Sequence, residues 1–366
     1  MTSIPLPLLV ASAGLLIGIA FGATAQRTNF CTMGAVADMA ATGDTRRFRA
    51  WVLATAVAIA GSQTLAVAGI VDLKQSIYLA PRLSWFSAIA GGLIFGFGMT
   101  MTGGCASKNL IRLGGGSLRS LVVLLVLGVV AYMTLRGLLA VPRLSLEAAT
   151  QIDLSRFGRT SQHLAELLVP SGSAGDGLHV AVAALAAFGL ALWCFKDAGF
   201  RKRWRDIAAG LVTGVLVTAA WLATGWLGAD PFEPAAVGSL SFVAPTADGL
   251  IYLMTFTGST LNFGIALAAG VIVGGFAGSI AGGDFKVQGF AGTDDMVRHL
   301  IGAAMMGVGG IMAMGCSIGQ GITGVSTLAA SSVLAWGSII IGAWYGIRYL
   351  EEGSLAGALR AVLSRS

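Results

Sequence analysis

Long apolar runs separated by short polar stretches dominate the chain. A helix needs about 20 apolar residues to cross the hydrocarbon core of a bilayer. Several uncharged runs are at least that long: Thr2 to Gln26, Ala50 to Val71, Leu83 to Ser107, Ile207 to Ala229 and Gly249 to Gly283. The pattern predicts an all-α polytopic membrane protein. We expect crossings at residues 8–25, 51–70, 85–104, 119–140, 178–195, 207–228, 249–283, 300–315 and 332–350.

Composition supports this prediction. Apolar residues make up 55% of the chain and charged residues only 11%, with a mean hydropathy of +0.81. These values lie far outside the usage of soluble domains. The first apolar run has no Lys or Arg before it and no clear small-residue cleavage site, so we do not expect a cleaved signal peptide.

One short pattern occurs twice. It reads Gly91-x4-Gly96-x-Gly98-x5-Gly104-Cys105 in the first half, and Gly302-x4-Gly307-x-Gly309-x5-Gly315-Cys316 in the second. In a helix, steps of seven residues place the glycines and the cysteine on one stripe. Small-residue stripes in apolar helices usually allow close helix packing, and that alone would explain the glycines. It does not explain why each stripe ends at a cysteine, with an amide, Asn109 or Gln320, four residues later.

We therefore interpret the two copies as a paired functional site, with Gly98 and Gly309 leaving the route to each thiol free of side chains. Irregular backbone at membrane depth persists only where protein or a water-lined cavity satisfies its polar groups. The repeat predicts two pseudo-symmetric halves related as an inverted repeat, with broken or re-entrant helices that meet at the midplane. The halves are residues 1–142 and 178–366 of one transport domain, joined by a polar connector at 143–177, within which Leu144 to Val169 is expected to form a surface helix.

The charges predict an orientation. Nine crossings that start outside place most of the 23 Lys and Arg on the cytoplasmic side, as the positive-inside rule requires. The N-terminus is then periplasmic and the C-terminus cytoplasmic. We interpret the net charge of +6 as topology, not as a nucleic-acid surface.

The chemistry of the breaks favours an anion. Half-helix N-termini after Cys105 and Cys316 offer free N–H groups and positive dipole ends. Lys108 either adds positive charge there or extends from a helix end towards water, and both readings stay open. A thiol is a soft, weak hydrogen-bond donor that suits a sulfur-bearing solute. The further residues expected to support the path are Gln26, Arg27, Asn29, Gly104, Asn109, Gly315 and Gln320.

The other cysteines and the histidines narrow the function. Cys31 follows a polar stretch and is either a small core residue or part of the wall of a polar cavity, and both readings stay open. Cys194 has no repeat partner, and we expect it to be a packing residue. The sequence has no CxxC, no Cys/His cluster and no Walker motif. We therefore expect a transporter, not an enzyme, with no catalytic residue, metal site or cofactor.

Three motifs resemble a known family, the YeeE/YedE sulfur transport family of bacterial inner membranes. They are Gly-x-x-x-Gln-Arg-x-x-Phe-Cys (Gly22 to Cys31), Gly-Gly-Cys-Ala-Ser (Gly103 to Ser107) with Arg112-Leu113-Gly114, and Gly-Cys-x-Ile-Gly (Gly315 to Gly319). The resemblance implies an hourglass-shaped helical fold in which Cys31, Cys105 and Cys316 line a narrow path and pass thiosulfate by transient S–H contacts. It also implies a separate sulfurtransferase of the TusA type as cytoplasmic partner.

The sequence is also compatible with three other functions. Some relatives in that family are linked to selenium or other sulfur species. A membrane-embedded sulfur relay would use Cys105 or Cys316 as a covalent persulfide carrier. A pore for a neutral solute would use the same helix breaks without any need for thiols.

Overall fold

The computed structural model describes residues 5–168, 176–230, 234–354, 356–358 and 360, and most of them are helical. The α-helices are α1 Leu6–Thr28, α2 Thr32–Thr42, α3 Arg46–Val67, α4 Trp85–Met101, α5 Ala106–Gly114, α6 Leu118–Leu135, α7 Ala140–Thr150, α8 Leu164–Leu168, α9 Asp176–Phe195, α10 Ala198–Arg201, α11 Trp204–Leu222, α12 Val243–Met254, α13 Phe263–Gly282, α14 Thr293–Met312 and α15 Ala330–Glu352. Short 3-10 turns are η1 Leu73–Gln75, η2 Ile77–Leu79, η3 Leu154–Phe157 and η5 Phe256–Gly258, and π-helical turns are η4 Ala223–Leu227 and η6 Gly319–Gly324. The two-residue strands β1 Arg82–Leu83 and β2 Ile152–Asp153 pair antiparallel.

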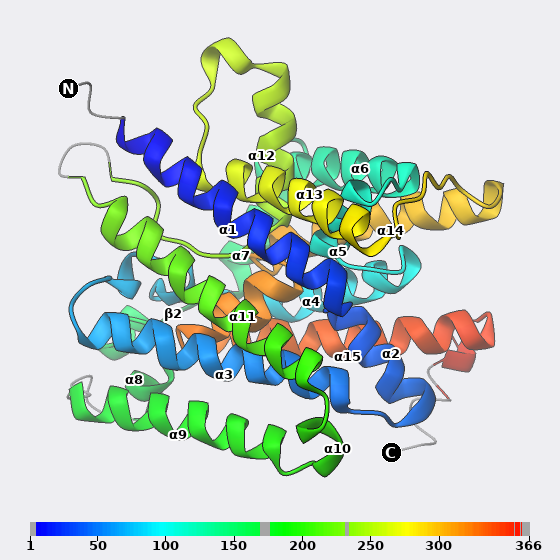
Figure 1. Cartoon of the computed structure of the whole chain (residues 1–366). Coiled ribbons are helices and arrows are strands. Elements are labelled where there is room, and N and C mark those ends of the chain that lie inside the picture. Colours follow the sequence, from blue (N-terminus) through cyan, green and yellow to red (C-terminus); the bar gives the residue numbers. More distant parts are fainter. Residues whose placement is uncertain (1–4, 169–175, 231–233, 355, 359, 361–366) are drawn as a thin grey trace.

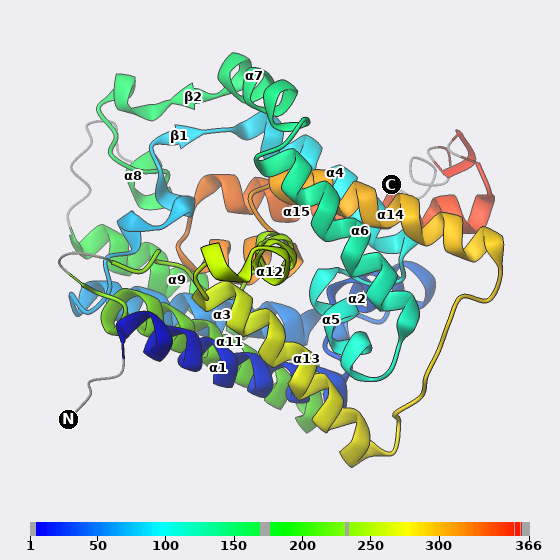
Figure 2. The ribbon, with the colours of Figure 1, turned by 90° about the horizontal axis from the view of Figure 1, so that it is seen from above.

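The long helices lie side by side along one direction, and α12 stands across them (Figures 1 and 2). Within the described ranges, eight segments are long and apolar enough to cross a membrane. The remaining expected crossing, residues 300–315, corresponds to α14, which has 20 residues but carries charged side chains in its first two turns, from Asp294 to Arg298. The prediction of an all-α polytopic protein is confirmed.

Two predicted segments are wrong. Residues 249–283 do not form one crossing, because α12 ends at Met254 and the Asn262 side chain caps a new helix, α13, by accepting the N–H of Ile265 (2.9 Å). The expected surface helix, Leu144 to Val169, is not one helix. Its first residues form the end of α7, which stops at Thr150. Strand β2, η3 and α8 follow it, and residues 169–175 lie outside the described residues.

The helices present two unlike ends. We call the basic face the end at which α1 finishes beside Arg27, α3 begins at Arg46 and α11 follows Arg203. The opposite face is the end at which α1 begins, on the left of Figure 1. Helices α1 and α13 run parallel between these faces, since Gly14 lies against Phe263 and Gly22 against Val271.

The two glycine stripes contact each other. Gly91 of α4 faces Gly309 of α14, and Gly98 faces Gly302, so the two helices run antiparallel. A Cβ atom at Gly309 would lie 2.5 Å from the Phe95 backbone nitrogen, and one at Gly98 would lie 2.7 Å from the Gly302 carbonyl oxygen. The interpretation of Gly98 and Gly309 as an open route to the thiols is therefore wrong, because the backbone of the other helix occupies that space.

We expect Gly309→Ala to lower the thermal stability of the protein in detergent. The added methyl group forces α4 and α14 apart, and overpacking of this kind costs roughly 1 to 3 kcal/mol. Gly337→Ala is the matched control, because Gly337 lies in α15 with no atom within 4 Å of its added Cβ. The control should melt at or above the parent temperature. Equal melting of the Gly309→Ala variant and the parent would contradict the packing role.

Candidate functional site

The first break lies between α4 and α5. Gly103 adopts a left-handed backbone (φ 65°) that is easy for glycine. The Thr102 hydroxyl donates to the Gly104 carbonyl (2.8 Å), and the Asn109 amide donates to the carbonyls of Gly104 (3.0 Å) and Cys105 (3.1 Å). These bonds satisfy carbonyls that an unwound helix would leave free. The Asn109 nitrogen, predicted to support the path, holds the break in shape.

The second break has the same local backbone. Met314 takes the left-handed conformation of Gly103 (φ 54°), and Leu328 takes that of Gly116 (φ 56° and 96°). The Gln320 amide donates to the Ala313 carbonyl, so it too ties the unwound backbone. The helical segment after Cys316 is one residue longer than α5 and contains the π-helical turn η6.

The three predicted path thiols, Cys31 before α2 and Cys105 and Cys316 at the two breaks, lie near one another. Cys105 lies close enough to Cys31 on one side and to Cys316 on the other for their charges to interact. Cys105 and Cys316 are 1% and 0% exposed, whereas Cys31 is half-buried. The thiol of Cys105 hydrogen-bonds Ser107 (3.2 Å), and the Cys316 sulfur accepts the N–H of Gly319 (3.3 Å). Residues 31, 105 and 316, which we call the thiol series, therefore lie near one another, with Cys105 interacting with both of the others.

Positive charge lies on the basic-face side of this series. Lys108 is only 7% exposed, and its ammonium donates to the Asn29 side-chain oxygen (3.0 Å). Arg112 lies within electrostatic range of both Cys31 and Cys105. Neither Lys108 nor Arg112 has a carboxylate partner among the residues that the structure describes. A buried and a half-buried cation without counter-ions favour an anion nearby.

Arg47 orders the chain before α2. Its guanidinium donates to the Asn29 carbonyl (2.9 Å) and forms an ion pair with Asp38 (3.0 Å). Asn29 itself has a left-handed backbone (φ 54°) at the end of α1. These contacts fix the turn that holds the Asn29 side chain at Lys108.

Two predicted path residues face elsewhere. Arg27 is exposed and its guanidinium contacts the Ala281 carbonyl (3.5 Å) at the end of α13, and Gln26 lies against Gly278 of the same helix. Both side chains contact α13, and none of the hydrogen bonds described around the thiols involves them.

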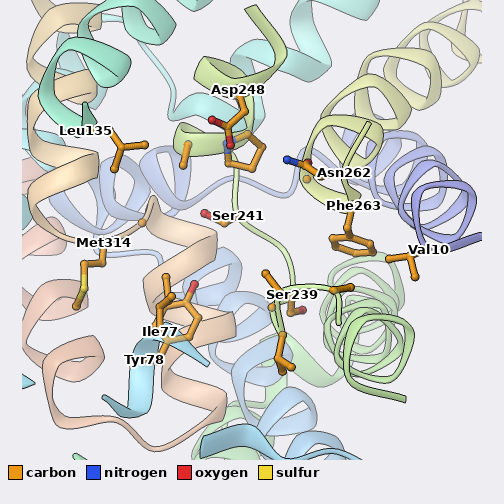
Figure 3. A pocket seen from close by; sticks show the side chains of 18 of the residues that line it. Val10, Ile77, Tyr78, Leu135, Ser239, Ser241, Asp248, Asn262, Phe263 and Met314 are labelled. Atoms are coloured by element: carbon orange, nitrogen blue, oxygen red, sulfur yellow. The ribbon is translucent and has the colours of Figure 1, made fainter. Parts of the chain in front are cut away.

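A cavity of about 660 Å³ lies on the opposite face and extends inward to the second break. Its walls come from the start of α1, η2, the segment 234–241, α12 and the start of α13, and it reaches Met314 and Gly315 at the second break (Figure 3). Polar groups on these walls include Tyr78, Ser241, Asp248 and Asn262. Tyr78 lies within electrostatic range of Cys316. The predicted path residue Gly315 thus forms the inner end of the cavity.

Cys194 lies apart from this site. Its thiol donates to the Arg49 carbonyl (3.2 Å), and the Arg49 guanidinium stacks over Trp193 at 4.2 Å from the ring centroid. A fully buried thiol held by a backbone carbonyl is typical of a structural cysteine. These contacts are those of a packing residue.

Sequence reasoning did not find several residues of the site. Ser317 lies beside the Cys105 thiol, and its hydroxyl makes no hydrogen bond of normal geometry among the described residues. Tyr78, Ser241 and Asp248 come from connecting segments or from α12, where the sequence has no periodic or motif signal. Arg112 had a signal in the sequence, because it belongs to the motif Arg112-Leu113-Gly114 and lies in the helix that begins after Cys105.

We expect a charged maleimide to label Cys31 at least about 10-fold faster than the other three cysteines, because accessibility limits thiol reactivity. Peptide mass spectrometry of protein in native detergent would measure this, with urea-treated protein as the fully reactive control. Labelling of Cys105 or Cys316 as fast as that of Cys31 would contradict the burial described here.

Comparison with known proteins adds an independent finding. Residues 27–345 match the profile of a family described as sulphur transport. The chain is 26% identical over 357 residues to the thiosulfate transporter TsuA of Escherichia coli K12, which covers 91% of this chain and 92% of the relative. It is 28% identical over 350 residues to TsuA of Spirochaeta thermophila (90% and 96%). The probable transporter YedE of Escherichia coli K12 is 31% identical over 100 residues, which is 27% of this chain and 23% of that relative.

Proposed function

Because the chain belongs to the sulphur transport family, we propose that it carries thiosulfate across a bacterial inner membrane. The likeness to two thiosulfate transporters over about nine-tenths of the chain is the observation that carries this proposal. The eight apolar spans and the cavity that reaches the second break fit a transporter. The substrate would enter this cavity from the periplasm.

The proposed path runs from the cavity past Cys316 and Cys105 to Cys31. Thiosulfate presents a terminal sulfur and three oxygens. A thiol is a weak donor and a polarizable contact, which suits the sulfur end. The electrostatic interaction of Cys105 with both Cys31 and Cys316 supports a path in which the anion passes from one thiol to the next. Asn109 and Gln320 would act indirectly, by holding the breaks that present the thiols.

Charge supports an anion over a neutral solute. Moving a dianion from water into the protein is costly unless positive groups compensate it. Lys108 and Arg112 lie beside the basic-face end of the thiol series without carboxylate partners in the described part of the chain. A pore for a neutral solute would gain nothing from two such cations.

The orientation follows from the positive-inside rule. The basic face would be cytoplasmic, which places the N-terminus in the periplasm and the C-terminus in the cytoplasm. The matching local backbone at the two breaks and the antiparallel contact of α4 with α14 support an inverted repeat. A separate sulfurtransferase of the TusA type would receive thiosulfate at the basic face.

Burial argues against a covalent sulfur relay. A persulfide carrier must present its sulfur to a second protein. Cys105 and Cys316 are 1% and 0% exposed, so neither can be reached by a soluble partner in this conformation. Selenium or another sulfur anion remains the alternative substrate, and competition of these anions with labelled thiosulfate in inverted and right-side-out vesicles would decide between them.

We expect Cys105→Ala and Cys316→Ala each to reduce thiosulfate uptake at least about 10-fold with little change in expression. The substitution removes the sulfur atom and leaves the β-carbon in place, so little volume is lost and the fold should persist, whereas the soft contact is lost. Cys31→Ala should have an intermediate effect. Uptake of labelled thiosulfate into vesicles measures this.

Cys194→Ala is the matched control for these variants, because Cys194 is equally buried and lies outside the thiol series. It should transport like the parent. If Cys194→Ala lost uptake as severely as Cys105→Ala, or if both path variants transported normally, the thiol path would be refuted.

We expect Lys108→Gln and Arg112→Gln to raise the KM for thiosulfate by about 10-fold or more, since each removes a charge that compensates the dianion at close range. Arg119→Gln is the control, because Arg119 is also basic but pairs with Asp295 (3.5 Å). An unchanged KM in both path variants would mean that the two cations serve only the fold.

A further inference from the structure

The cavity on the opposite face contains an acidic group that a path for a dianion does not explain. Asp248 of α12 lines the cavity together with Asn262 and Tyr78 (Figure 3). It is half-buried, and no hydrogen bond or ion pair to its carboxylate is described in the structure. An ionised carboxylate on this wall repels the substrate that the wall must admit.

The charged groups around Asp248 do not remove this repulsion. Arg136, which follows α6, interacts with Asp248 only through space. Arg143 of α7 also lines the cavity, but it forms an ion pair with Glu147 (2.8 Å) and donates to the Thr134 carbonyl (3.0 Å). This pair is neutral as a unit.

The other elements packed against α12 supply no compensating charge. Helix α13 contributes the neutral cap Asn262 to the cavity, and η2 contributes the Tyr78 hydroxyl. Helix α14 contributes Gly310 and Ile311, and its charged residues lie in its first two turns, at the other end of the helix. Among the described residues, Asp248 is therefore the acid of the cavity wall that no ion pair neutralises.

We propose that Asp248 is a proton-binding group that controls entry of the anion: the cavity admits thiosulfate when the Asp248 carboxyl is protonated and excludes it when the carboxylate is ionised. This inference rests on the proposed function and adds to it a titratable residue that determines anion affinity. The proton comes from water on the opposite face and returns to it when the anion leaves the cavity. No bond other than the O–H bond of the carboxyl forms or breaks.

The surroundings of Asp248 shift the pKa of its carboxyl in the direction that favours the protonated form. Burial raises the pKa of the Asp248 carboxyl above its ordinary value, and the nearby Arg136 guanidinium opposes the rise in part. The acid form is the neutral one, so the competent fraction grows as the pH falls. The apparent affinity for a ligand scales with the competent fraction. The KM for thiosulfate should therefore rise with pH above the Asp248 pKa, by up to about tenfold per unit.

The test is the pH dependence of KM for labelled thiosulfate in right-side-out vesicles, over about three pH units, for the parent and Asp248→Asn. Thiosulfate stays a dianion throughout this range, so the slope belongs to the protein. The parent should lose affinity as the pH rises. Asp248→Asn should bind with one KM at every pH, close to the low-pH value of the parent, because the amide copies the neutral carboxyl. Asp248→Glu should restore a pH slope.

Asp153→Asn is the matched control, because Asp153 is an acid that lies outside the cavity, where it caps η3 by accepting the N–H of Ser155 (3.0 Å). It should keep the pH slope of the parent. The buried His163 does not interfere, because burial and His179 lower its pKa to about 4. The same slope in Asp248→Asn and the parent would overturn the proposal and leave Asp248 as a partner of Arg136 only. Absence of uptake by the parent at every pH would instead refute thiosulfate transport itself.

Discussion

The direct backbone contact between α4 and α14 determines the rest of the arrangement. At Gly91, Gly98, Gly302 and Gly309 each helix lies so close to the other that no Cβ atom fits. Both helices unwind where this contact ends. Because the end of each helix packs against the partner helix, the separation of the two breaks is fixed, and Cys105 and Cys316 lie within electrostatic range of each other. The glycines therefore influence the site by setting the separation of α4 and α14, and they do not line a passage to the thiols.

Unwinding a helix inside a bundle leaves backbone carbonyls that must find donors. Here the donors are side chains within the breaks: Thr102 and Asn109 at the first, and Gln320 at the second. The donor groups used in this way are occupied, whereas the Gln320 side-chain oxygen and the Ser317 hydroxyl make no hydrogen bond of normal geometry among the described residues. On the proposed path, a solute would therefore meet these two groups, the thiols and the two cations on the basic-face side.

Local signals in the sequence predicted the helices, the two breaks and the thiols. Each break combines glycine, polar side chains and a cysteine within a few residues, and such clusters are rare in apolar helices. Contacts between distant residues could not be predicted in this way. Lys108 meets Asn29 from 79 positions away, and Asp248 reaches the cavity from a helix whose end lies within an uncharged run. That run hid the turn before Asn262, because a turn made of neutral residues does not interrupt hydropathy.

The extra residue after Cys316 makes the two cysteine segments unequal. Between its left-handed residues, the second segment holds one residue more than the first, and the π-helical turn η6 takes it up. A solute that moves along the proposed path would therefore leave through two unlike ends, one lined by Tyr78 and Gly315 and the other by Lys108 and Arg112. Because of detailed balance, two unlike ends cannot by themselves concentrate the solute on one side of the membrane. The inequality would set unequal escape rates towards the two sides of the membrane, so a bound anion would leave more often through one end than through the other.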